Sequence, residues 1–253
     1  MTPTFGNGDV RLDRRVKTTS GPLERPTLLG RAAQDRRGIV TRTILAFGDS
    51  LTYGADAETG GRHRFENRWP SVLEVGLGGA ARVIAEGLGG RTTMFDDHGA
   101  AADRNGARIL PTLLGSHHPL DLLIIMLGTN DLKPHVCGTV LGAGAGMERL
   151  VEIARTYPYG RGAAAPQVLI VAPPLFGPTV GGDWQPSGGR SIAESQKLAP
   201  RYRDAAEYCG CAFFDAASVA TASPVDGVHL DAANTRAIGQ ALVPVVRQLL
   251  ALD

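Results

Sequence analysis

The chain has 253 residues, a formal net charge of +1 and a hydrophobic fraction of 43%. These values fit one α/β domain with a large core, and they exclude wholesale disorder. A charge this close to neutrality gives no global electrostatic basis for binding nucleic acid. The sequence contains no run of about 18 apolar residues, so we expect no membrane span.

The N-terminal segment differs from the remainder of the chain. Residues 1–41 are basic, contain Gly, Pro and Thr, and have no sustained periodicity. We predict a flexible extension here, with an anchor to an anionic surface or an oligomer arm as the alternatives. The folded domain is expected to span residues 42–253.

The cysteines bear on the cellular compartment. Cys137, Cys209 and Cys211 form neither a disulfide framework nor a zinc-binding pattern. We therefore predict buried free thiols, and with them a cytoplasmic protein.

Short apolar runs alternate with longer amphipathic segments along the domain. Strands are predicted at residues 44–47, 82–85, 121–127, 167–172 and 212–214, and helices at residues 69–77, 105–114, 142–155, 191–208 and 232–250. The third apolar run has no polar residue between positions 122 and 127, which is typical of a parallel strand buried on both faces. The alternation predicts a flavodoxin-like, three-layer αβα sandwich around a mainly parallel five-stranded sheet.

Two long loops follow predicted strands. Residues 55–68 and 175–189 are rich in Gly, and the second loop also contains Pro. Both are expected at the carboxyl edge of the sheet, where open α/β folds place their ligands. Tyr53, just before the first loop, and Trp184, within the second, are therefore candidate walls of a substrate pocket.

A serine lies where the first predicted strand should turn into a helix. Ser50 belongs to the run of residues 47–54, in which Gly48 and Asp49 precede it. Such a turn projects a hydroxyl outward, next to the free N–H groups at a helix start. By itself the run slightly favours a simple helix N-cap by Asp49 or Ser50.

Three further segments hold groups that are useful in catalysis. The glycine-rich residues 86–93 permit close approach of backbone N–H groups to a substrate, and they lack the Lys and the spacing of a phosphate-binding P-loop. Asn130 offers a neutral side-chain donor, although a plain turn also explains it. Asp226 and His229 are spaced so that a tight turn can pair carboxylate with imidazole.

Each of the four segments follows, or nearly follows, a different predicted strand, so the fold brings them to one edge. Together they supply a nucleophile, a base, an orienting acid and two kinds of oxyanion donor, which are the groups that acyl transfer requires. A non-catalytic binding module with the same fold is the rival interpretation, and a nucleotide-binding protein is a more distant one.

The order and content of these segments resemble the SGNH (GDSL-type) hydrolase family over residues 43–250. The resemblance implies a serine esterase that needs no metal and no organic cofactor. It also implies six roles: Ser50 as nucleophile, His229 as base, Asp226 as its partner, and the Ser50 N–H, the Gly90 N–H (or that of Gly89) and the Asn130 side chain as oxyanion donors.

Residues 47–54, 86–93 and 124–131 resemble more narrowly the arylesterase/acyltransferase branch of that family. The branch implies hydrolysis of short acyl and aryl esters, transfer to alcohols or hydrogen peroxide, and homo-oligomers. Tyr53 and Ala55 replace Trp residues that are common in the branch, which predicts a wider pocket. The alternatives within the family are esterases that act on acetylated sugars or on lysophospholipids.

Several other polar residues are assigned supporting or surface roles. Asp49 is expected to tie down the nucleophile turn, and Asp131 and Arg91 are expected to support the site from behind. The remaining histidines lack metal-ligand spacing and are predicted to be surface or capping residues: His63, His98, His117, His118 and His135.

Overall fold

The computed structural model describes residues 41–180 and 185–252. The basic extension predicted for residues 1–41 therefore lies, up to residue 40, outside the described residues. Trp184, a predicted pocket wall, also lies outside them.

Five parallel strands form one sheet in the order β2-β1-β3-β4-β5. They span Arg42–Gly48 (β1), Ala81–Gly87 (β2), Leu122–Met126 (β3), Gln167–Ala172 (β4) and Ala212–Asp215 (β5). The central strand β3 is buried along its whole length, as its uninterrupted apolar sequence requires. The predicted five-stranded parallel sheet is confirmed.

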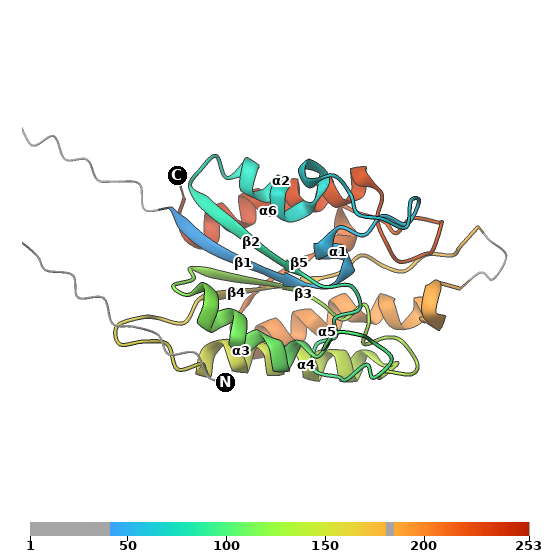
Figure 1. Ribbon diagram of the computed structural model, residues 1–253, viewed down its shortest axis with the longest axis horizontal. Coiled ribbons are helices and arrows are strands. Elements are labelled where there is room, and N and C mark those ends of the chain that lie inside the picture. The colour runs from blue at the N-terminus through green and yellow to red at the C-terminus, as the bar shows by residue number, and fades with distance from the viewer. Residues whose placement is uncertain (1–40, 181–184, 253) are drawn as a thin grey trace, which may run out of the picture. The chain divides into compact units, whose positions relative to one another are not determined.

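Helices cover both faces of the sheet (Figure 1). Helices α2 and α6 lie over one face, and α3, α4 and α5 lie over the other, which confirms the predicted αβα sandwich. The α-helices are α1 (Ser50–Tyr53), α2 (Trp69–Gly76), α3 (Gly106–His117), α4 (Val140–Thr156), α5 (Ile192–Cys209) and α6 (Ala232–Leu250), and short 3-10 helices span Phe65–Asn67, Ser187–Gly189 and Ala216–Ser218.

Two apolar cores stabilise the layers. Side chains of β1 alternate between them, with Leu45 and Phe47 in the core under α3–α5 and Ile44 and Ala46 in the core under α2 and α6. This alternation follows from the two-residue period of a strand. Full burial of one such aliphatic or aromatic side chain stabilises the fold by about 1.5–3 kcal/mol, so each layer holds the strand ends in place.

The first three strands end at the same level of the sheet. Gly48 of β1 pairs with Gly87 of β2 and with Met126 of β3. The short helix α1 lies directly against this edge: a Cβ on Gly87 would be 2.2 Å from the Tyr53 backbone nitrogen. The absence of a side chain at Gly87 therefore lets the helix that begins at Ser50 sit on the strand ends.

None of the helices within residues 41–180 and 185–252 is long and apolar enough to cross a membrane. Cys137, Cys209 and Cys211 are free, as predicted. The prediction that they are buried is wrong, because all three are partly exposed. Cys209 ends α5 and Cys211 precedes β5, which places both at the rim of the core.

Candidate active site

Ser50, His229 and Asp226 form one continuous hydrogen-bonded chain. His229 Nε2 lies 2.9 Å from Ser50 Oγ, and His229 Nδ1 lies 2.5 Å from Asp226 Oδ2. Ser50 is the first residue of α1, whereas Asp226 and His229 belong to the loop before α6. Residues 179 positions apart in the sequence thus meet, in the arrangement that activates a hydroxyl for attack on a carbonyl group.

A tight turn fixes the carboxylate of Asp226. Its Oδ1 accepts hydrogen bonds from the N–H groups of Val228 and His229, both at 2.9 Å, and Gly227 takes a positive φ of 70° within the turn. Burial raises the pKa of Asp226, but the hydrogen bonds from His229 and the two N–H groups outweigh it and hold the pKa at about 2. The carboxylate therefore stays charged beside the imidazole ring at neutral pH.

Asp49 organises the turn before the serine. Its Oδ1 caps α1 by accepting the Leu51 N–H at 2.9 Å. The side chain is fully buried, and this burial raises the pKa of Asp49. The structure thus places Asp49 behind Ser50 and outside the chain of hydrogen bonds to His229, in line with the tethering role expected for it.

Asn130 is held by three partners. Its Nδ2 donates to Asp49 Oδ2 at 3.3 Å and to the Arg91 carbonyl at 3.1 Å. Arg190 Nη2 donates to its Oδ1 at 2.9 Å. The carboxamide is therefore oriented rigidly at the edge of the sheet, and an incoming oxyanion would have to share an N–H that already has an internal acceptor.

Gly90 adopts a φ of 83°, which favours glycine. Among the described residues, neither its amide nor that of Ser50 has a hydrogen-bond acceptor, so both are free to bind an anion. Arg91 fixes the glycine segment to the sheet, because its Nη1 donates to the carbonyl of Gly48 at 2.8 Å and also to that of Glu86.

Asp131 supports the same segment from below. Its carboxylate accepts the Thr93 N–H at 3.1 Å and the Thr93 hydroxyl. Burial raises the pKa of Asp131 to about 6 despite these hydrogen bonds. Arg91 thus fixes the chain next to Gly90, and Asp131 fixes it at Thr93, in line with the supporting roles expected from the sequence.

A cavity of about 680 Å³ opens over Ser50, Asn130 and His229. Tyr53 and Ala55 line it, as do Gly89 and Gly90. The geometry therefore brings the sequence-predicted serine, histidine, asparagine, glycine and tyrosine to one opening. Four basic side chains complete its wall, and the sequence patterns pointed to none of them: Arg62, Arg104, Lys133 and Arg190.

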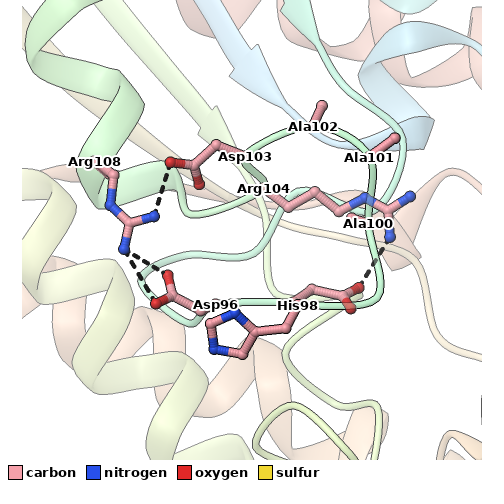
Figure 2. Close-up of a pocket in the computed structure, with 9 residues that line it drawn as sticks. Asp96, His98, Ala100, Ala101, Ala102, Asp103, Arg104 and Arg108 are labelled. Carbon is pink, nitrogen blue, oxygen red and sulfur yellow. Dashed lines mark hydrogen bonds and ion pairs between the residues drawn. The ribbon is translucent and has the colours of Figure 1, made fainter.

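Arg104 also lines a second, smaller cavity of about 270 Å³ within the loop after the glycine segment (Figure 2). Arg108 of α3 forms ion pairs with Asp96 and Asp103 of that loop, whereas Arg104 extends toward the opposite side and pairs with Asp97 at 2.9 Å. The loop thus fixes one guanidinium at the edge of the cavity over Ser50.

His63 was predicted to be a surface or capping residue, and this prediction is wrong. The side chain is buried, with its residue 7% exposed, and its Nε2 lies 2.9 Å from the Leu230 carbonyl. Asp56 of the same loop forms an isolated β-bridge with Leu230. Loop 55–68 therefore braces the segment that holds His229, an interaction between distant segments that no local pattern reveals.

Comparison with known proteins assigns the chain to a family. The model of the GDSL-like Lipase/Acylhydrolase family matches residues 46–237, which contain all the residues of the site. No curated protein sequence matches the chain.

Solved structures give the same result in more detail. A carbohydrate acetylesterase family member from Sinorhizobium meliloti is 52% identical, with 84% of this chain and 100% of that chain covered and a TM-score of 0.79. A provisionally named arylesterase from Agrobacterium tumefaciens str. C58 is 57% identical and has a TM-score of 0.81, with 83% of this chain and 100% of that chain covered. The aryl esterase of M. smegmatis is 42% identical, with 83% and 100% covered and a TM-score of 0.77.

These matches extend over nearly the whole described part of the chain and agree with the fold and with the order of its motifs. The chain belongs to the GDSL-like lipase/acylhydrolase (SGNH) family and is a carboxylic ester hydrolase.

Proposed function

We propose that Ser50 is the nucleophile of this esterase, with His229 as its base and Asp226 as the partner of His229. His229 Nε2 takes the Ser50 proton while Oγ attacks the ester carbonyl carbon, and it then protonates the leaving alkoxide or phenoxide. Water attacks the acyl-Ser50 intermediate, again with His229 as base. The observation that supports this assignment is the Ser50–His229–Asp226 chain of 2.9 and 2.5 Å at the cavity.

The oxyanion is proposed to bind the amides of Ser50 and Gly90 together with the Asn130 side chain. The two amides are supported by the absence of an acceptor for either among the described residues. Gly89 also lines the cavity and is the alternative to Gly90. Asn130 is supported by its rigid position beside Ser50, where one N–H would be shared between Asp49 and the oxyanion.

The proposed substrates are esters of short acyl groups with aryl or small alcohols. The 42% identical M. smegmatis aryl esterase supports this class. Transfer of the acyl group to an alcohol or to hydrogen peroxide is a further proposal, which the resemblance to the arylesterase/acyltransferase branch supports. Tyr53 and Ala55 line the cavity at positions where Trp is common in the branch, so water should compete with these acceptors.

A carbohydrate acetylesterase is the second candidate. Two structural neighbours bear that description: the S. meliloti family member and Est24 from the same organism, which is 37% identical. Tyr53, which is 36% exposed at the cavity, offers an aromatic face to a sugar ring. A lysophospholipid is less well supported, because Tyr53 and Leu88 are the only large apolar side chains among the described lining residues.

Three further proposals concern the domain bounds, the cellular location and the oligomeric state. The catalytic domain is placed in residues 42–253, in keeping with the family match over 46–237. The three free thiols support a cytoplasmic location. The family resemblance supports a homo-oligomer, which sedimentation velocity would measure directly.

The test compares the wild-type protein with Ser50→Ala on p-nitrophenyl acetate, p-nitrophenyl octanoate and acetylated xylan, each with and without a primary alcohol. We expect rapid acetate turnover that disappears in Ser50→Ala, and little octanoate turnover. Formation of alkyl acetate when the alcohol is added would support acyl transfer. Preference for acetylated xylan would favour the second candidate, and full activity in Ser50→Ala would refute the proposed nucleophile.

A further inference from the structure

The wall of the cavity over Ser50 is strongly basic. Arg62, Arg104, Lys133 and Arg190 line it, and no carboxylate does so among the described residues. A chain with a net charge of only +1 has thus gathered four cations around one opening. A neutral acetyl or aryl ester gives no reason for such a concentration of positive charge.

Intramolecular partners neutralise only part of this charge. Asp97 is shared, at 2.9 Å from Arg104 and at 3.6 Å from Lys133, so two positive charges face one negative charge. The side chain of Lys133 is only 14% exposed. Burial, together with the positive charge of Arg190, lowers the pKa of Lys133 against the effect of Asp97. Burying an incompletely paired cation is costly, and such groups are concentrated at functional sites.

Arg190 has no carboxylate partner among the described residues. Its guanidinium donates to the carbonyls of Thr129 and Ser187 and to Asn130 Oδ1. These neutral acceptors orient the side chain, and the carboxylates of Asp49 and Asp226 act on its charge without forming an ion pair with it. Arg190 therefore presents a fixed positive charge at the cavity, and its 6% exposure shows that this charge is largely withdrawn from solvent.

The cations also lie close to the reacting groups. A Cβ on Gly90 would be 2.5 Å from Arg104 Nε, so Arg104 covers one proposed oxyanion donor. Arg190 binds the side chain of another proposed donor, Asn130, and Lys133 lines the same cavity. Arg62, which also lines the cavity, stacks over Tyr53 at 4.0 Å. A substrate bound at Ser50 would therefore share the cavity with all four cations.

We propose that the preferred substrates of this esterase carry an anionic oxygen group, such as a carboxylate, in addition to the ester that is cleaved. Lys133 and Arg104 bind that group, and the charge of Arg190 adds to their attraction. The inference rests on the proposed function, because it assumes that esters react at Ser50. It narrows the substrate class from short esters in general to acidic ones, including acidic sugar esters if the second candidate function holds.

Two matched pairs of esters test the proposal. On the alcohol side, 3-acetoxybenzoate is compared with 3-acetoxybenzamide, and on the acyl side the p-nitrophenyl monoester of adipic acid is compared with that of adipamic acid. Each pair differs by one negative charge at nearly constant size. The measured quantity is the ratio of kcat/KM for the anionic ester to that for the neutral ester, so the intrinsic reactivity of each ester cancels between protein variants.

Lys133→Gln and Arg104→Gln should each lower this ratio about tenfold in at least one pair, the loss typical of a charged hydrogen bond. High salt should lower the wild-type ratio by screening. Arg149→Gln is the matched control. Arg149 pairs with Glu152 on the exposed surface of α4, so this substitution removes the same charge at a place away from the cavity. It should leave the ratio unchanged.

Equal ratios in the wild type, Lys133→Gln and Arg104→Gln for both pairs would overturn the proposal, as would the same change in Arg149→Gln. Two separate variants keep the test valid if one of them unfolds, which thermal unfolding would reveal. The proposed function is scored independently: 3-acetoxybenzamide must be hydrolysed by the wild type and not by Ser50→Ala. If that holds while the ratios stay flat, only the inference about anionic substrates fails.

Discussion

Replacing Asp226 by Asn removes the charge of this side chain while keeping its shape. Asp226 Oδ1 accepts two backbone N–H groups at 2.9 Å, and an Asn carbonyl oxygen can accept both, so the turn should persist. The Asn NH2 then faces His229 Nδ1. The imidazole must carry its proton on Nε2, toward Ser50 Oγ, and can no longer accept the serine proton. We expect kcat/KM to fall about 10⁴-fold.

The same substitution should change the response of stability to acid. The pKa of Asp226 is about 2, against an ordinary value of 3.8. This difference corresponds to about 2 kcal/mol of unfolding free energy. Because the pKa is lowered, that contribution is fully present above about pH 4 and is lost as the pH falls toward 2. Urea unfolding of Asp226→Asn should therefore show about 2 kcal/mol less stability at pH 7 and a shallower loss in acid.

The control for Asp226→Asn is Asp231→Asn. Asp231 caps α6 by accepting the Asn234 N–H at 2.7 Å, and Asn is an equally good N-cap. The control should keep its activity on p-nitrophenyl acetate. A folded Asp226→Asn protein that retained a tenth of the wild-type kcat/KM would refute the argument from the tautomer of His229.

Three further substitutions probe the groups around the serine. Asn130→Ala should lower kcat on p-nitrophenyl acetate about 100- to 1000-fold. It should also lower stability by about 1–3 kcal/mol, because Arg190 loses a buried hydrogen-bond acceptor, and thermal unfolding should show that the protein still folds. Gly90→Ala should destabilise the protein by about 1–2 kcal/mol and slow turnover, because its φ is 83° and the added Cβ would lie 2.5 Å from Arg104. The pKa of Asp131 is about 6, against an ordinary value of 3.8, so the folded protein binds this proton more tightly than the unfolded chain does. The free energy of unfolding should therefore rise by up to about 3 kcal/mol as the pH falls from 7 toward 4. Asp131→Asn should lose this pH dependence in urea unfolding.

Local sequence patterns are sufficient to predict the frame of this molecule. The run of residues 122–127 becomes the buried central strand because it has no polar side chain to solvate. Strand β1 ends at Gly48, as predicted. Strand β4 ends directly before Pro173, which cannot donate a hydrogen bond to the sheet. Boundaries are less well defined: α3 continues to His117 instead of ending at residue 114, and it ends before Pro119, where a helix is disfavoured.

Three motifs of the site could be predicted because Ser50, Gly90 and Asn130 each follow a strand end closely. The fourth could be predicted because the spacing of Asp226 and His229 allows a tight turn. The groups that surround them could not. Arg190 reaches Asn130 across 60 positions and His63 reaches Leu230 across 167. Each binds a carbonyl oxygen or a neutral amide. Because the acceptor carries no charge, no pair of opposite charges in the sequence indicates the contact. The near-neutral total charge likewise conceals the basic cavity, because its cations are far apart along the chain.

Covalent labelling of the serine tests the central claim most directly. The wild-type protein is treated with a fluorophosphonate, digested, and analysed by mass spectrometry, with Ser50→Ala and Asp226→Asn treated in parallel. We predict one adduct, on the peptide that contains Ser50, formed rapidly in the wild type, slowly in Asp226→Asn, and not at all in Ser50→Ala. An adduct on another residue, or an active wild-type protein that resists labelling, would contradict the assignment of Ser50 as the nucleophile.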